Sequence, residues 1–505
     1  MAKDKRNIPS KSEDFNSWYP FIVEAADLVD KRYPIKGMDV WRPYGWKAMR
    51  LIDELTREQM ENTNHEEVNF PLLIPENLLE KENALVARLK RAREEGVNPD
   101  DLRMDEEEAG FKKEVYWVKH AGENELDIPM FLRPTSETAM YTMFPLWIRS
   151  HADLPLKTFQ IVNTFRYETK QTRSFIRVRE IHFFEAHTAH VDEDDASNQI
   201  AEDLEIVDRL MHQLCLPIIK AKRPEWDTFP GAWYTIGIDA IMPNGRTLQV
   251  ASCHHYRDQW AKAFDLTYED GDGNQQFCHQ TTYGMSERLL GAIVGMHGDD
   301  NGLIMPPAIA PIQVVIIPIV RKESAEQINN AAEEIARQLK QVGLRIKLDN
   351  RDIRPGTKYY DWEIKGVPLR LELGLRDLEN KSVFSAKRTG GKQPIPLENL
   401  IEGVRSLLDE VSEELRQRSV QHLSNVIQPL PEFAPTEDGW VMNGEITEGL
   451  IYEMAFAGSD AEAEVIERST SLGFLGDATE PYEEERPCHM TGKMTTRRVL
   501  LSKSY

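Results

Sequence analysis

The sequence contains few cysteines and has no long apolar run. Four of its 505 residues are cysteines, Cys215, Cys253, Cys278 and Cys488, and no two of them are closely spaced. This usage excludes a disulfide-stapled secreted scaffold and favours a reducing compartment. Nowhere do about 18 apolar residues follow one another, and the N-terminal segment has no apolar core of a signal peptide. We therefore expect a cytoplasmic protein that does not enter a membrane.

The sequence also has few basic residues relative to acidic ones. Its 61 Lys and Arg residues are outnumbered by 84 Asp and Glu residues, which gives a net charge of −23. Such acidity argues against DNA as a partner, but it does not exclude RNA, because phosphate contacts are made by local basic patches. Two such patches are present, at 166–179 and 351–376. The length exceeds what one core can organise and predicts two to four domains of α/β class.

The stretch 157–190 alternates with a period of two and predicts a β-hairpin with a polar loop at 169–174. We expect its arms to direct five side chains into one space: Arg166, Glu168, Phe183, Glu185 and His187. A guanidinium matches two phosphate oxygens at once, and a carboxylate can accept from the amine of adenine. A cross-strand ion pair on a solvated sheet is the plain alternative. The aromatic residue and the Glu–x–His on the second arm favour a site.

Two predicted helix starts carry residues suited to charged ligands. Thr135 and Glu137 follow Pro134, where a hydroxyl and an acid are typical of any helix start, although the pair could also hold an ammonium group. Arg288 lies in the first turn of a helix predicted to begin near Ser286. Free N–H groups and the helix dipole favour an anion there.

The stretch 245–265 predicts a strand that leads into a turn with Gln249, Ser252, Cys253, His254 and His255. The Cys-His-His run suggests a metal ligand set. Adjacent residues on a strand point to opposite faces, however, and cannot all bind one ion. We expect no metal at this cluster.

The composition changes at Met305-Pro306-Pro307, after which a buried strand, a helix and a second strand predict a βαβ unit. Interleaved aromatic and basic residues at 351–376 suit single-stranded bases, or else form an ordinary charged surface. We predict domains at 1–305, 306–418 and 419–505. Within the first, a helix from Tyr44 leads to an extended piece containing Pro71, and a charged helical excursion covers 80–113.

Taken in order, these motifs resemble the class II aminoacyl-tRNA synthetases, and specifically the prolyl-tRNA synthetases of the archaeal and eukaryotic type. The helix into Pro71 is similar to motif 1, 163–190 to motif 2 and 281–307 to motif 3. RPTSE at 133–137 resembles the proline-binding loop, and 365–377 the anticodon-domain signature. The resemblance implies a catalytic core built on an antiparallel sheet flanked by helices, an α/β anticodon-binding domain and a small α/β C-terminal domain.

The resemblance also implies an activity and partners. Such an enzyme activates L-proline with ATP, releases pyrophosphate, and transfers proline from the prolyl-adenylate to the 3′ end of tRNA(Pro). It works as a homodimer and uses Mg²⁺ with its ATP. A synthetase paralogue without aminoacylation activity, and an enzyme that also activates cysteine or alanine, remain alternatives, because one methylene discriminates by only about 1–3 kcal/mol.

Residue roles follow the same resemblance, with Arg166 and Arg288 as the catalytic pair. The proline-binding set is Thr135, Glu137, Arg166, Phe183, Glu185, His187 and His254. The ATP-binding set is Arg166, Glu168, Arg177, the backbone at Val178, Gln249, Ser252, Ser286 and Arg288, with Mg²⁺ near Gln249. The anticodon candidates are Lys358, Glu363, Lys365, Arg370 and Arg376.

The sequence departs from the family pattern in its C-terminal domain. Relatives carry four zinc-binding cysteines, and the matching positions here are Ala457, Glu462, Cys488 and Thr491, so a structural zinc is not expected. Leu375 replaces a usual proline before Arg376, which affects only local backbone. The interval between Arg166 and Arg288 leaves no room for an editing insertion. Clearing of mischarged alanine would therefore need another protein.

Overall fold

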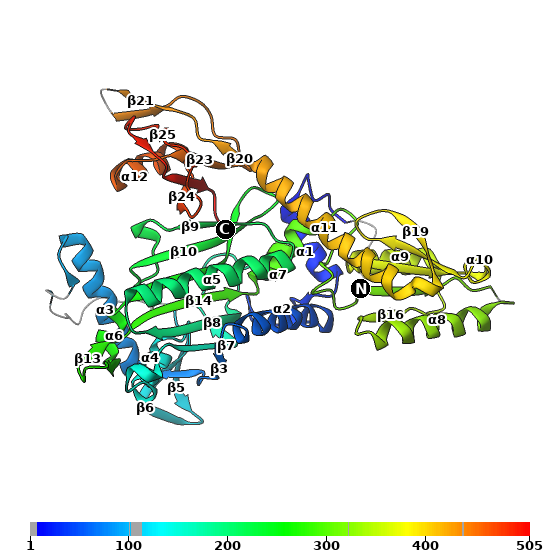
Figure 1. Cartoon of the computed structure of the whole chain (residues 1–505), viewed down its shortest axis with the longest axis horizontal. Helices are drawn as coiled ribbons and strands as arrows, with labels where there is room; N and C mark the ends of the chain where they lie inside the picture. Colours follow the sequence, from blue (N-terminus) through cyan, green and yellow to red (C-terminus); the bar gives the residue numbers. More distant parts are fainter. Residues whose placement is uncertain (1–7, 100–101, 103–113, 322, 437–438) are drawn as a thin grey trace.

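The computed structural model describes residues 8–99, 102, 114–321, 323–436 and 439–505. Figure 1 shows a catalytic part at one end, an anticodon-domain-like α/β part at the other, and a C-terminal part above the first. Within the described residues, every helix is too short or too polar to cross a membrane.

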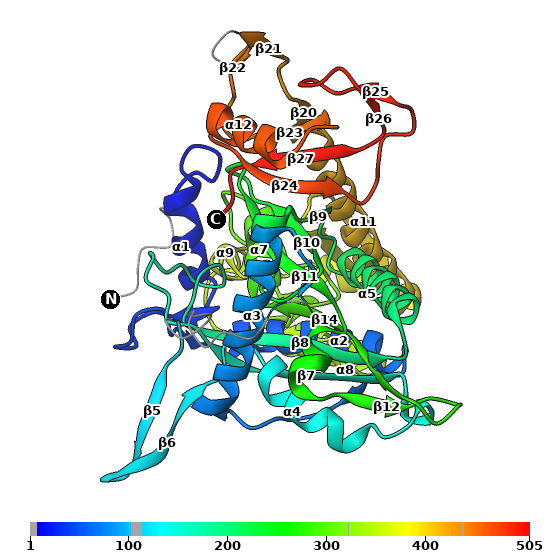
Figure 2. The same ribbon diagram turned by 90° about the vertical axis from the view of Figure 1, so that its left-hand side faces the viewer.

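One mixed sheet of eleven strands runs through the catalytic and C-terminal parts. In spatial order its strands are β20 (Ile427–Pro429), β23 (Ile451–Ala455), β27 (Arg498–Ser502), β24 (Gly473–Ala478), β9 (Ile218–Lys222), β10 (Tyr234–Ile241), β11 (Thr247–Arg257), β14 (His279–Ser286), β8 (Glu180–His190), β7 (Leu156–Phe165) and β3 (Glu66–Glu67). Its pairs are antiparallel except β3 with β7 and β20 with β23. The predicted catalytic sheet is confirmed, and β24 pairs with β9 to continue it into the C-terminal part, as Figure 2 shows.

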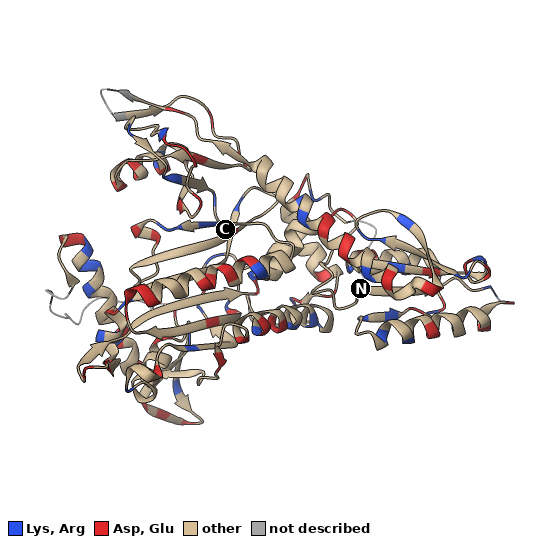
Figure 3. Ribbon diagram, viewed as in Figure 1, with Lys and Arg blue, Asp and Glu red and all other residues tan. Residues whose placement is uncertain are grey.

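Helices cover one face of this sheet and bury the main core against it. They are α1 (Phe15–Ala25), α2 (Pro43–Glu61), α5 (Glu193–Gln213) and α7 (Arg288–His297). The apolar stripe predicted after Tyr44 is buried at Ala48, Leu51 and Ile52. Helix α5 begins with Glu193, Asp194 and Asp195, which complement the positive end of its dipole. Figure 3 shows that acidic residues continue along the outer side of α5 and along α11.

Three predicted boundaries in the catalytic part are wrong. Strand β7 ends at Phe165 and β8 begins at Glu180, so the connecting loop is longer than 169–174. The backbone of Arg179 bonds instead to the Gly37 carbonyl, which takes this segment out of the sheet. Strand β11 continues through His255 without the predicted turn. Helix α7 begins at Arg288, because β14 extends to Ser286.

The expected solvated excursion is also partly wrong. Helix α3 (Glu76–Glu95) buries Leu79, Leu85 and Leu89, which pack in the cores beside α4 (Glu137–Trp147) and α6 (Gln259–Phe264). Residues 103–113 of the excursion lie outside the described residues. The flanking strands β4 (Leu73–Pro75), β5 (Trp117–Ala121) and β6 (Asn124–Leu132) form a separate small sheet.

The predicted βαβ unit is confirmed in a second, five-stranded sheet of order β16-β15-β17-β18-β19. Its elements are β15 (Val314–Pro318), α8 (Ala325–Gln341), β16 (Ile346–Leu348), α9 (Pro355–Ile364), β17 (Leu369–Leu373), α10 (Leu375–Glu379), β18 (Ser382–Lys387), β19 (Lys392–Pro396) and α11 (Leu400–Val426). Helix α11 crosses the expected boundary at 418 and leads directly into β20.

The C-terminal part packs α12 (Asp460–Thr470) on β23, β24 and β27, around Phe456, Phe474 and Leu501. The remaining short strands are β1 (Val29–Asp30), β2 (Val40–Trp41), β12 (Thr267–Glu269), β13 (Gln275–Phe277), β21 (Phe433–Thr436), β22 (Gly439–Met442), β25 (Arg486–Pro487) and β26 (Met494–Thr495). The remaining short helical turns are η3 (His151–Asp153), η4 (Glu225–Asp227) and η5 (Leu397–Asn399). Tyr505 lies back on the core, where its backbone N–H donates to Thr247.

Candidate active site

Antiparallel register aligns mostly polar residues in two rows across the sheet face that points away from α5 and α7. One row runs through Thr235, His254, Thr282, His187 and Thr158, which are successive partners on five strands. The other row runs through Gly237, Ser252, Gly284, Glu185 and Gln160. Because side chains alternate along a strand, His254 belongs to this face and Cys253 and His255 to the opposite one. The argument against a Cys-His-His metal set is thereby confirmed.

Two glycines in the second row are required by close neighbours. A Cβ on Gly237 would lie 2.2 Å from the guanidinium of Arg223, which crosses the sheet there. A Cβ on Gly284 would lie 3.1 Å from the ring of Phe183. The missing side chains therefore make room for Arg223 and Phe183 on the sheet floor.

The segment before α4 closes one end of the site through a buried network centred on Glu185. Ser136 donates its backbone N–H to Glu185 at 3.0 Å and also its hydroxyl, while Gln160 donates its amide at 2.8 Å. Thr135 donates to Glu137, which also accepts from the Tyr256 hydroxyl at 3.0 Å. Both carboxylates are buried. The helix start and β8 therefore hold two buried carboxyl groups, those of Glu137 and Glu185, in fixed positions.

Glu185 and His187 form a fully buried pair, with His187 Nε2 3.1 Å from the carboxylate. Burial by itself disfavours charge on both groups. The His187 hydrogen bond and charge nevertheless lower the pKa of Glu185, and Glu185 raises the pKa of His187. His187 Nδ1 lies 3.3 Å from the hydroxyls of Tyr141 and Thr282. The Glu185 carboxylate is therefore kept ionised although it is fully buried.

His254 is in the opposite condition. Burial, with the charges of His187 and Arg166, lowers the pKa of His254 to about 3, so the imidazole is neutral. Thr235 lies 2.9 Å from its Nδ1 and Ser252 lies 3.1 Å from its Nε2. The Phe229 ring packs on it in a tilted arrangement, with 4.5 Å between centroids. His254 therefore presents a neutral flat wall.

Arg166 and Arg288 supply the positive charge of the site. Arg166 donates to the Pro134 carbonyl at 3.2 Å, and Arg288 donates to the carbonyls of Ile176 at 2.9 Å and Gln249 at 3.1 Å. Burial and the nearby Arg166 charge lower the pKa of Arg288 to about 10. Two guanidinium groups held close together in this way create a strong preference for a polyanion.

The loop after β7 orients Glu168 beside these arginines. Arg177 donates to its carboxylate at 2.7 Å, and the Lys170 backbone N–H donates to the other oxygen at 2.7 Å. Arg179 donates to the Glu168 carbonyl at 3.0 Å. Although burial opposes it, these hydrogen bonds and charges lower the pKa of Glu168. Glu168 is therefore a fixed acceptor at the end of the site.

A cavity of about 670 Å³ collects most of the expected residues. Its lining includes Thr135, Glu137, Arg166, Glu168, Arg177, Val178, Phe183, Gln249, Ser252, His254, Ser286 and Arg288. Glu185 and His187 are fully buried beneath its floor. Sequence reasoning missed Arg223, Phe229 and Thr235 in the lining, and the supporting hydroxyls of Tyr141 and Tyr256. All but Tyr141, which lies on α4, come from 223–256, a stretch whose contacts no local motif indicates.

The anticodon candidates do not form one cluster. Glu363 and Arg370 pair at 3.0 Å in the lining of a cavity of about 270 Å³ that also includes Trp362. Lys358 is buried and donates to the Asp349 carbonyl at 2.9 Å. Lys365 pairs with Asp27 of the catalytic part, and Arg376 lies exposed on α10.

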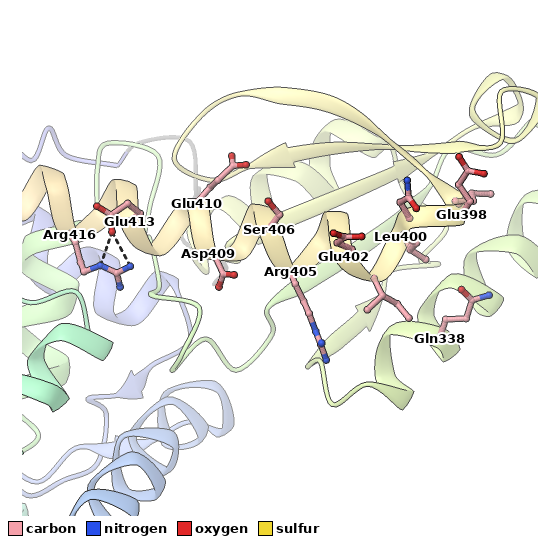
Figure 4. A pocket seen from close by; sticks show the side chains of 13 residues that line it. Gln338, Glu398, Leu400, Glu402, Arg405, Ser406, Asp409, Glu410, Glu413 and Arg416 are labelled. Carbon is pink, nitrogen blue, oxygen red and sulfur yellow. Dashed lines mark hydrogen bonds and ion pairs between the residues drawn. The ribbon is translucent and has the colours of Figure 1, made fainter.

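A larger hollow of about 860 Å³ follows α11 near the end of α8. Figure 4 shows its side chains pointing in different directions, with Glu398 and Glu410 away from Arg405. Its lining is a strip of helix surface with no convergent polar set, so we assign no site there.

The comparisons with known proteins agree with this geometry. Residues 116–297 match the tRNA synthetase class II core domain (G, H, P, S and T), and 313–407 match an anticodon binding domain. Fold and site thus define a class II aminoacyl-tRNA synthetase.

Full-length relatives show which family within this class the chain belongs to. A proline–tRNA ligase of Thermococcus kodakarensis is 48% identical, covering 95% of this chain and 94% of its own. One of Methanocorpusculum labreanum is 43% identical over the full length of both chains. The structure of Giardia lamblia prolyl-tRNA synthetase in complex with prolyl-adenylate superposes with a TM-score of 0.87 at 33% identity, covering 99% and 100% of the two chains. The chain belongs to the proline–tRNA ligase family, of archaeal type.

Proposed function

We propose that the protein activates L-proline with ATP and then transfers the prolyl group to the 3′ end of tRNA(Pro). The observation that carries this proposal is one cavity whose lining includes Arg166 and Arg288 together with Glu137 at the start of α4. Such a site accepts a small amino acid at one end and a polyphosphate at the other. Family membership supports the same substrates.

At the amino-acid end, Thr135 and Glu137 would hold the protonated imino nitrogen of proline. Glu185 and His187 support this end from below, because their network fixes the Thr135 loop. Phe183 and the neutral ring of His254 would pack against the pyrrolidine ring. The pocket is then charged where the substrate is charged and flat where it is apolar.

At the nucleotide end, Glu168 would accept from the adenine amine while Arg177 and the backbone at Val178 flank the base. Gln249, Ser252, Ser286 and Arg288 would complete the contacts to ribose and phosphates. Mg²⁺ favours oxygen ligands and usually keeps waters and substrate phosphates in its shell. The amide of Gln249 fits as one hard donor beside them, and the ion would neutralise phosphate charge.

The chemistry requires alignment more than proton transfer. A proline carboxylate oxygen attacks the α-phosphorus, forming the acyl-phosphate bond while pyrophosphate leaves. Arg166 would hold the carboxylate and the α-phosphate together, and Arg288 the γ-phosphate, so that attack is in line. The terminal ribose hydroxyl of tRNA then attacks the prolyl carbonyl carbon, and AMP leaves. Neither step needs a strong general base.

Recognition of tRNA would extend to the domain around 306–418. Trp362 offers a stacking surface beside Glu363 and Arg370, a combination suited to an unstacked base read at its edge. Lys358, Lys365 and Arg376 are the remaining anticodon candidates. Within this proposal, Lys358 acts through the position of Asp349, because its side chain is buried.

We also propose a homodimer in the cytoplasm, formed through α2 and the segment containing Pro71. Leu72 and Leu73 beside that segment, and Leu146 and Trp147 on α4, are large apolar side chains that are 40–61% exposed. Exposed apolar residues of this density mark interfaces. Sedimentation should give twice the chain mass of 58.1 kDa.

ATP–pyrophosphate exchange with proline, cysteine, alanine, threonine and histidine in parallel tests the function. Exchange with proline far above the others supports the proposal. Comparable exchange with cysteine or alanine would replace it with the relaxed-specificity alternative, and silence with all five would favour a paralogue without aminoacylation activity.

A further inference from the structure

A second cavity, of about 340 Å³, lies behind the wall of the nucleotide site. It opens between the segment 29–46, the start of β8 and the residue before α7. Phe175, Val178 and Glu287 belong to its lining and to that of the active-site cavity. The two cavities therefore share a wall. The residue roles assigned above concern the first cavity, and none of them places a ligand in the second.

Aromatic rings form much of its surface. Trp41 lies 4.8 Å from Phe175 and 5.6 Å from Trp46, measured between ring centroids. Trp46 meets His182 edge-on at 5.1 Å. Trp41 and Trp46 touch edge to face and both line the cavity, so an occupant lies against these rings and not between them. The face of an aromatic ring attracts cations.

The charged side chains in the lining all have one sign. They are the carboxyl groups of Asp39, Glu180 and Glu287, and no lysine or arginine is among the described residues that line the cavity. Burial raises the pKa of Glu287 to about 8, so a bound cation would favour its ionised form. Asp39 accepts from Ser174 and Glu180 accepts from Asn163 at 2.8 Å, so these two are oriented by neutral donors. An occupant would meet negative potential without a competing protein cation in the lining.

Glu287 supplies the strongest indication of a missing ligand. The residue is 3% exposed, and its Oε2 has no hydrogen-bond partner. A buried polar atom without a partner costs free energy unless something binds it. His182 Nδ1 is likewise unpartnered, although Nε2 of the same ring lies 3.0 Å from Asp53. Donors from an occupant would satisfy Glu287.

We propose that this cavity binds a small planar organic cation, of the aryl-amidine or aryl-guanidine class, against Trp41 and Trp46 with its N–H donors on Glu287. An occupant would press on Phe175 and Val178 and so change the affinity for ATP at the neighbouring site. That consequence rests on the proposed function, whereas the binding itself does not.

The test uses three probes of one shape and different charge, namely benzamidine, neutral benzamide and anionic benzoate. Calorimetric titration of the full chain, with saturating L-proline present to occupy the amino-acid end, should show benzamidine binding at least about tenfold more tightly than either control. Equal affinities, or no benzamidine binding, would overturn the proposal. Normal L-proline binding in the same preparations would leave the proposed function standing.

Variants locate the bound probe. Trp46→Ala should weaken benzamidine binding at least fivefold, whereas Trp226→Ala, which removes a tryptophan of similar exposure (44% against 38%), should leave it unchanged. Glu287→Gln should abolish the preference for benzamidine over benzamide. Should Trp46→Ala fold poorly by circular dichroism, Asp39→Asn is the second variant and should weaken the cation alone. Unchanged affinity in a folded variant would contradict the assignment.

Discussion

Arg388, which follows β18, donates from both terminal nitrogens of its guanidinium to the carboxylate of Asp299, which follows α7. One of these bonds measures 2.8 Å, and Arg388 Nε also donates to the Glu363 carbonyl at 3.3 Å. The Arg388 guanidinium is buried, whereas the Asp299 side chain is 40% exposed. Arg288 begins α7, a helix of ten residues, and Asp299 follows its far end. The pair thus joins the anticodon-binding domain to the helix that begins with Arg288.

Arg388→Gln should separate the two half-reactions. The substitution leaves Asp299 without its bidentate partner and loosens the domain junction, while the active-site lining stays intact. We expect aminoacylation kcat/KM for tRNA to fall about tenfold and proline-dependent exchange to stay within about twofold. The matched control is Arg337→Gln, which removes an exposed ion pair on α8. A parallel fall in both reactions would show general destabilisation instead.

The sequence predicted the fold best where periodicity and composition act locally. The α2 stripe, the βαβ unit after 305 and the pairing of β7 with β8 follow from apolar spacing, which directly determines what can be buried. The loop 166–179 was predicted too short, because its polar alternation imitates a strand while Gly37, more than a hundred residues away, accepts the Arg179 N–H. No local pattern carries that information.

The site residues that the sequence predicted, and those it missed, differ in the same way between local and long-range contacts. Arg166, Glu168 and Glu185 were found because chemistry and alternation coincide on one hairpin. Arg223 was missed because its guanidinium fits only over Gly237, which has no side chain. The two residues come together only when β9 and β10 pair. Glu185 was predicted to contact substrate, and this stays a prediction. The structure shows the carboxylate fully buried among five donors, an environment that spacing alone does not reveal.

Arg166→Ala should abolish adenylate formation. The guanidinium would hold carboxylate and α-phosphate in the transition state, and removing one preorganised donor of this kind costs about 100- to 1,000-fold in rate. Exchange should fall by at least that factor, with circular dichroism and sedimentation unchanged. The exposed Arg149→Ala, in the same part of the chain, should retain activity. Near-normal exchange by Arg166→Ala would exclude the catalytic assignment.

Glu185→Gln should affect proline more than ATP. The amide retains the shape but removes the charge that raises the pKa of His187, so the imidazole becomes neutral and the Thr135 loop loses its anionic anchor. We expect KM for proline to rise about tenfold and KM for ATP to change less than about twofold. Glu205→Gln on the exposed side of α5 serves as the control. Equal rises in both constants would point to a structural defect.

Asp203→Asn should change how stability depends on pH. Burial on α5 raises the pKa of Asp203 to about 8, although Gln199 donates to it at 2.9 Å. The folded chain thus retains a proton that the unfolded chain releases near pH 4, and wild-type stability falls as pH rises from about 4 to 8. The variant mimics the protonated form and should lack this slope. Scanning calorimetry should give similar Tm values at pH 5 and a variant Tm about 3 °C or more higher at pH 9. Parallel slopes would contradict the assignment.

The C-terminal domain should keep its stability without zinc. Of the four positions that match ligands in relatives, Ala457 has no donor atom, and Glu462 accepts from the Ser459 backbone N–H at 2.7 Å and from its hydroxyl, as a helix cap. Packing of Phe456 on Phe474, 5.5 Å apart, and the strand pairing of β24 with β9 hold the domain instead. A structural zinc supplies folding free energy directly, so its removal would unfold the domain. Purified protein should contain less than about 0.1 zinc per chain, and a strong chelator should leave Tm unchanged. One tightly held zinc per chain, lost together with C-terminal stability, would contradict this prediction.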